Sequence, residues 1–302
     1  MGFEFVSAPG GSADSATAAA CAADAARLVQ ALTVDLASEK IDLPSFPEVA
    51  ARARKALANE FVEIEDVVRI ISAEPALAAR LLQLANSAAL NSSGRRIADL
   101  RQALSRIGFN MARSATIAFA MSQLRRAEAY KGLEQPLDEL WQWSAHVAAV
   151  SHAVAKRFSR VNPDTALLSG VLHGIGRLYL LTRAARFPLV LQDPSTYQRI
   201  VTEYHGRLAQ AILRNWEIPE EVVEAVLACE NHDREHDGAT DLTDVLSVGG
   251  ALASLGPAPV PEQMLFLGMP AARRMKLDAD GCMAALKESH EEILSLRQAL
   301  GS

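Results

Sequence analysis

The sequence predicts an all-α protein, and three observations support this prediction. Apolar residues recur at helical spacing along most of the chain, capping residues stand at the breaks, and no stretch has the alternation typical of strands. The 302 residues are 50% apolar and 22% charged, which is enough to bury a core and too apolar for a disordered chain. The length is that of one or two domains.

The first helices follow from apolar spacing. Residues 1–40 are expected to form a flexible Ala-, Ser- and Gly-rich leader that continues into a helix with leucines every four residues. Two helices are predicted next, over Glu48–Ala58 and residues 64–71, and Glu74-Pro75 begins a further one.

Capping residues mark the later helices. Asp99 is predicted to cap a helix that Gly108 ends, and a new helix follows. After Pro136 a long helix is expected to reach about Phe158, and Asn162-Pro163 supplies the N-cap and first turn of the next. Further helices are expected at residues 197–203, 206–215, 219–229 and 242–255, with longer connections at 183–195 and 231–240.

Residues 257–302 are predicted to form a separable helical extension. Asp278 is expected to cap a helix whose apolar side approximates a coiled-coil seam. The seam consists of Met283, Leu286, His290, Ile293, Leu296 and Leu300. Two interpretations stay open: the helix packs on its own domain, or it contacts a partner helix, as in a homodimer.

Charge and cysteine content restrict the partners and the location. The 30 basic and 36 acidic residues give a net charge of -6, which disfavours nucleic acid as the main partner. Three widely spaced cysteines, at positions 21, 229 and 282, suit a reducing cytoplasm. No uncharged apolar run approaches the roughly 18 residues of a membrane span, and the residues before Arg27 lack the positive charge of a secretory signal. We therefore expect a cytoplasmic protein without a membrane partner.

Several sequence blocks occur in a recognisable order between about residues 41 and 256. The most specific block starts at Glu74-Pro75 and ends in Leu-x-x-x-Asn-Ser at residues 82–87. The others are Leu43-Pro44-Ser45-Phe46-Pro47, residues 103–108, residues 141–144, residues 170–176, and His205 with Trp216-Glu217-Ile218-Pro219. Together they resemble the HDOD family, the HD-related output domain of bacterial signalling proteins. The resemblance implies an N-terminal bundle over about 41–130 that packs on an HD-like helical bundle over about 131–256.

The resemblance also implies where a metal site would lie, because HD relatives hydrolyse phosphoesters with bound metal ions. Their ligands are a His, a His-Asp pair, a further His, often a His-His pair, and a closing Asp. By local register two of these survive, His173 and His205. The other positions carry Trp143, Gly174, Cys229, Glu230 and, for the closing acid, Gly249-Gly250. Gly174 is the most serious loss, because glycine offers no donor atom where a carboxylate should bind.

Two imidazoles fall short of the three protein ligands of a hydrolytic zinc site, so the sequence predicts no metal, no cofactor and no catalysis. Both His173 and His205 can instead be hydrogen-bonded structural residues. A register shift of two residues would place Asn231-His232 on the double-His position and restore one ligand.

The polar run at residues 231–240 holds the remaining metal candidates. His232 and His236 are four residues apart and would share one face of a helix, with Asp233 nearby. A solvated loop is the alternative. This run and the 278–300 helix are also the candidate partner contacts.

These observations predict a non-catalytic bacterial signal-transduction or regulatory domain that acts through protein–protein interaction. Its partners would be other signalling proteins, such as cyclic-dinucleotide or kinase modules. The alternatives are a divergent metal-dependent phosphohydrolase acting on a nucleotide or cyclic dinucleotide, and a small-molecule sensor that uses the HD cleft without turnover. Gly174 and Trp143 argue against the enzyme and leave the sensor open.

Overall fold

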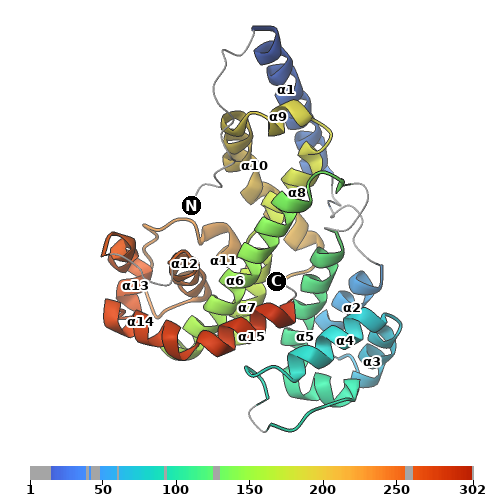
Figure 1. The fold of residues 1–302 in the computed structure, drawn as a ribbon, viewed down its shortest axis with the longest axis vertical. Coiled ribbons are helices and arrows are strands. Elements are labelled where there is room, and N and C mark those ends of the chain that lie inside the picture. The colour runs from blue at the N-terminus through green and yellow to red at the C-terminus, as the bar shows by residue number, and fades with distance from the viewer. Residues whose placement is uncertain are drawn as a thin grey trace.

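The computed structural model describes residues 15–38, 41, 48–59, 61–91, 94–124, 130–255 and 261–300, and it contains helices but no strand within them (Figure 1). The all-α prediction is confirmed. The predicted leader before residue 15 and the Leu43–Pro47 block lie outside the described residues.

The first five helices are α1 (Ser15–Ala37), α2 (Glu48–Ala58), α3 (Ile64–Ser72), α4 (Pro75–Ala85) and α5 (Leu100–Leu124). The next seven are α6 (Glu134–Phe158), α7 (Pro163–Leu172), α8 (Ile175–Ala184), α9 (Pro188–Leu191), α10 (Pro194–Asn215), α11 (Glu220–Ala228) and α12 (Leu242–Ala253). The last elements are the 3-10 helix η2 (Pro261–Gly268), α13 (Pro270–Arg274), α14 (Ala279–Glu288) and α15 (His290–Leu300).

Local signals explain several of these boundaries. The Asp99 carboxylate accepts a hydrogen bond from the Gln102 amide at 2.8 Å, and Asn162 accepts one from the Asp164 amide at 2.8 Å, as expected of N-caps. Gly108 ends the first helical part of α5, as predicted. Its φ of 72° and ψ of 168° are not helical, and a second helical part follows the kink.

Three predicted boundaries are wrong. The Ala-rich stretch from Ser15 onward is helical and belongs to α1, in keeping with the high helix propensity of alanine. The helices expected at 197–203 and 206–215 are one helix, α10, which the Asp193 side chain caps. The connection at 183–195 contains the short helix α9.

The long helix α6 forms the centre of the molecule. It packs against α7, α12 and α15, while α5 joins α2 and α4 to α7. Figure 1 shows α2–α5 on one side of α6, α11–α13 on the other, and α1 at the far end beside α8–α10. Arg183 of α8 holds α1 in place, because its Nε donates to Asp35 Oδ2 at 2.7 Å.

The C-terminal seam is not continuous. The helix breaks at the buried Ser289, whose hydroxyl accepts a hydrogen bond from Arg157 Nε at 2.7 Å, and His290 is exposed. Beyond the break, α15 packs on α6, α4 and α5 with Ile293, Leu296 and Leu300 buried. The apolar face of α15 is therefore used within the chain, and a homodimer through this helix stays a prediction.

Among the described residues, none of the helices combines the length and hydrophobicity that a membrane span requires.

Candidate functional site

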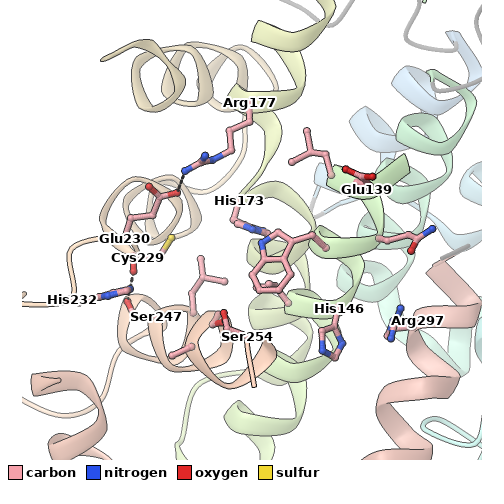
Figure 2. A pocket seen from close by; sticks show the side chains of 17 residues that line it. Glu139, His146, His173, Arg177, Cys229, Glu230, His232, Ser247, Ser254 and Arg297 are labelled. Carbon is pink, nitrogen blue, oxygen red and sulfur yellow. Dashed lines mark hydrogen bonds and ion pairs between the residues drawn. The ribbon is translucent and has the colours of Figure 1, made fainter. Parts of the chain in front are cut away.

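A cleft of about 670 Å³ lies between α6, the corner that joins α7 to α8, the end of α11, α12 and α15 (Figure 2). It brings together six residues that the sequence had singled out, namely Trp143, His173, Cys229, Glu230, His232 and Gly250. His205 is not among the lining residues, but its Nε2 lies 3.6 Å from Glu230 Oε2. The residues at the register positions of the HD ligands therefore line or adjoin one cleft.

Gly174 stands at the corner, as the N-cap of α8, and the space beside it is filled by α6. A Cβ at Gly174 would lie 2.8 Å from Ser144 Oγ and 3.4 Å from Leu140 Cδ1. Ser144 is only 2% exposed, so a larger side chain at this position would have to displace a packed one. A side chain at position 174 would thus have to move Ser144.

A second glycine of the corner allows close packing against α10. A Cβ at Gly176 would lie 1.9 Å from the His205 carbonyl oxygen, closer than any non-bonded contact allows. Gly176 therefore lets α8 pack closely on α10.

Three imidazoles in or beside the cleft, those of His146, His173 and His205, have lowered pKa values. Burial lowers the pKa of His173, and the neighbouring Arg177 contributes in the same direction. The His173 Nδ1 lies 2.7 Å from the Gly170 carbonyl oxygen, which identifies Nδ1 as the protonated nitrogen. Burial also lowers the pKa of His205 and of His146, which lines the opposite side of the cleft.

Cys229 and Glu230, at the double-His position, are poor metal ligands here. Burial raises the pKa of the Cys229 thiol to about 12, and its Sγ donates to the Val226 carbonyl at 3.4 Å. Burial would raise the pKa of Glu230, but the Arg177 guanidinium, 2.8 Å from Glu230 Oε1, lowers it on balance. Figure 2 shows this ion pair at the edge of the cleft.

The residues present therefore do not fit the metal centre of an HD phosphohydrolase. One position has no side chain, one thiol is buried with a raised pKa, and one carboxylate is paired with an arginine. A guanidinium beside His173 also opposes a second cation electrostatically. Within the described residues, the three ligand-type side chains that do cluster lie elsewhere, at His236, Asp241 and Asp244.

The polar run at 231–240 is a loop and not the helix that would have paired its two histidines. It is not helical, so His232 and His236 do not share a face: His232 lines the cleft, whereas His236 Nε2 lies 3.0 Å from Asp244 Oδ2 at the start of α12. Asp233 is exposed and does not belong to that cluster. Gly238, with φ of 111°, turns the chain between the histidines and α12.

The His236 cluster is an ion-pair network. Asp244 is 1% exposed, and Arg274 Nη1 lies 3.0 Å from both of its carboxylate oxygens. Arg234 Nη2 binds Asp241 at 2.6 Å. Two guanidinium groups thus neutralise the acids that a cation would need, and the network fixes the run to α12 and α13. The run is therefore the largely exposed loop that stood as the alternative to a helix, and ion pairs attach part of it to α12 and α13.

Several polar residues that line the cleft were not candidates from the sequence, among them Arg177, Ser247 and Arg297. Arg177 is four residues beyond His173 and could have been found from that spacing. Arg297 could not, because it reaches the cleft only through the packing of α15 (Figure 2).

Comparison with known proteins agrees with this architecture. The HDOD domain family model matches residues 43–232, and this chain belongs to the HDOD family. An uncharacterized protein of Treponema pallidum (strain Nichols) is 22% identical over 209 residues, which are 65% of this chain. The chain spans only 39% of the length of that curated relative.

Solved structures share the fold. A protein of Shewanella amazonensis SB2B, provisionally named a metal-dependent phosphohydrolase, superposes with a TM-score of 0.72 at 24% identity, covering 92% of this chain and 99% of that one. A protein of Marinobacter aquaeolei VT8, provisionally named a signal transduction protein, gives 0.58 at 20% identity, covering 93% of this chain and 66% of the other. The predicted HDOD-like bundle is therefore confirmed.

Proposed function

We propose that this chain is a non-catalytic regulatory domain that transmits a signal by binding other proteins. One observation carries the proposal: Gly174 offers no donor atom at the position where the HD pair has its carboxylate, and a Cβ there would lie 2.8 Å from Ser144 Oγ. Hydrolysis by this class of fold needs enough ligands to hold an ion and an open position for an activated water. The name of the Marinobacter relative agrees with a signalling role.

The competing function is a divergent phosphohydrolase, which the name of the Shewanella relative favours. Such an enzyme would have to assemble a metal centre from His173, His205 and Glu230. Glu230 would first have to leave Arg177, which now lies 2.8 Å away.

Metal content separates these two functions. The full chain is purified without chelator and measured for iron, manganese and zinc, then assayed for phosphodiester hydrolysis with added Mn²⁺ and a cyclic-dinucleotide panel. We expect well under one equivalent of metal and no hydrolysis above the blank. One or two equivalents of metal that disappear in His173→Ala would overturn the proposal, provided that His290→Ala, which is exposed and outside the cleft, keeps them.

A small-molecule sensor is the second candidate, and the size of the cleft favours it. Its volume of about 670 Å³ is within the roughly 300–1,000 Å³ of ligand pockets. A nucleotide present at 100 times its Kd would add about 2.7 kcal/mol to the unfolding free energy, which thermal denaturation detects. No shift with any nucleotide would count against the sensor.

The proposed setting is the cytoplasm. Cys21, Cys229 and Cys282 are all free thiols, which supports a reducing compartment.

A further inference from the structure

A second hollow lies away from the cleft and is built from the most specific block of the sequence. Leu82, Asn86 and Ser87 line a groove of about 770 Å³ between the end of α4, residues 94–98 and α15. In Figure 1, α15 runs along α4 and α5. The proposed regulatory function makes no use of this groove so far.

Asn86 builds one wall of the groove. Its Nδ2 donates to the carbonyl oxygens of Leu82 at 2.9 Å and Ile97 at 2.7 Å, and its Oδ1 accepts from the Ile97 amide at 2.7 Å. Arg106 supports the same wall, because its Nη1 donates to the Ala85 and Arg95 carbonyls at 3.1 and 3.2 Å. The wall is therefore fixed by side-chain hydrogen bonds to backbone.

Ser87 is a buried residue of the groove wall. The residue is 8% exposed, and its Oγ, which is itself buried, has no hydrogen-bond partner among the described residues. A buried polar atom without a partner is costly. Gln83, Ser295 and Gln298 line the groove beside it and offer further uncharged donors and acceptors, the groups that bind a peptide backbone.

Charge distinguishes the groove from the rest of the molecule. Its described lining contains Arg96 and no acidic residue. Arg96 is exposed and belongs to a chain whose net charge is -6. The one charged side chain of the described lining is therefore basic, and an acidic ligand is complementary to it.

We propose that this groove binds an acidic peptide segment of a partner protein. The inference rests on the proposed regulatory function and names the surface and the chemistry of the partner. A peptide is favoured over nucleic acid because no aromatic side chain lines the groove within the described residues, so bases have nothing to stack on.

The test selects the peptide and then maps it. Random decapeptides are panned against the full chain, and the enriched sequences are synthesised with a fluorescent label for anisotropy titration. We expect enrichment in Asp and Glu, with affinity that falls as salt rises. Arg96→Glu should weaken binding by about tenfold or more, Ser87→Ala by a smaller factor, and Arg160→Glu, a matched exposed arginine outside the groove, by less than about twofold.

Three results would overturn the inference: no enrichment, enriched peptides that bind Arg96→Glu as tightly as the unchanged chain, or tighter binding of an oligo-dT decamer. Circular dichroism shows whether each variant is folded. The metal measurement is independent, since a metal-free chain that binds no peptide refutes the groove alone. A chain with a bound metal centre refutes the non-catalytic function instead.

Discussion

The cleft and the groove differ in how many of the family's motif residues each retains. In the cleft, the ligand positions of HD relatives carry residues such as Gly174 and Trp143, and α6 fills the space beside the glycine. In the groove, the Leu82–Ser87 block is complete, and Asn86 uses both its oxygen and its nitrogen to fix a wall. The difference shows that the family's most specific sequence block stabilises the fold. Whether the cleft can bind a metal has to be decided from the side chain at each ligand position.

The largest expected effect concerns the packing of the cleft corner. Gly176→Ala places a methyl group 1.9 Å from the His205 carbonyl oxygen, so we expect it to lower the unfolding free energy by about 3 kcal/mol or more. Gly250→Ala, also in the cleft wall but with nothing within 4 Å of the new Cβ, should be neutral or stabilise by up to about 1 kcal/mol. Urea denaturation measures both, and similar losses for the two would show that the corner is not close-packed.

The next effect tests the intact motif of the groove. Asn86→Ala removes three hydrogen bonds to backbone and should cost about 2–3 kcal/mol. Gln83→Ala, on the same helix but exposed, should stay within about 0.5 kcal/mol. Hydrogen exchange at the Ile97 amide should speed up in the Asn86 variant, because that amide loses its acceptor. An unchanged rate at Ile97 would contradict the assignment of Asn86 as the wall.

A smaller effect concerns α15, which lines both hollows through Arg297 in the cleft and Gln298 in the groove. Its Glu292 lies 3.3 Å from His152 Nδ1 and pairs with Lys156, and these two neighbours lower the pKa of Glu292 to about 2. The unfolded chain has the ordinary value of 4.5, so this stabilisation is complete above about pH 5 and is lost as the pH falls toward 2.

We expect a loss of about 2 kcal/mol over that range, reduced in Glu292→Gln. Unfolding titrations between pH 5 and pH 2 measure it. Glu288→Gln is the matched control, because Glu288 is exposed and its ion pair is with the α6 residue Arg157, so it should keep the slope of the unchanged protein. An identical acid profile for Glu292→Gln would argue against the α6–α15 pairing.

Local chemistry predicted much of the fold. The bounds of α2 were correct, and Asp99 and Asn162 cap the helices that they were expected to cap, because such signals act within a few residues. The prediction divided α10 into two helices, the second beginning at Gly206. A glycine can stay helical when the helix is packed, as α10 is against α8 and α11.

The site was predictable only in part. His173 and Glu230 were placed correctly, since the motif order follows the fold. The Ser144 contact with Gly174, the Arg177 pairing of Glu230 and the entry of Arg297 depend on helices that meet only in the tertiary structure. The same is true of Arg274, which lies 30 residues beyond Asp244 and neutralises it.

Crystals of the purified chain grown with Mn²⁺, and measured at the manganese absorption edge, test the central claim most directly. We predict no anomalous peak in the cleft, Ser144 still beside Gly174, and Arg177 still on Glu230. Manganese bound by His173 and Glu230, with Arg177 displaced, would contradict the account.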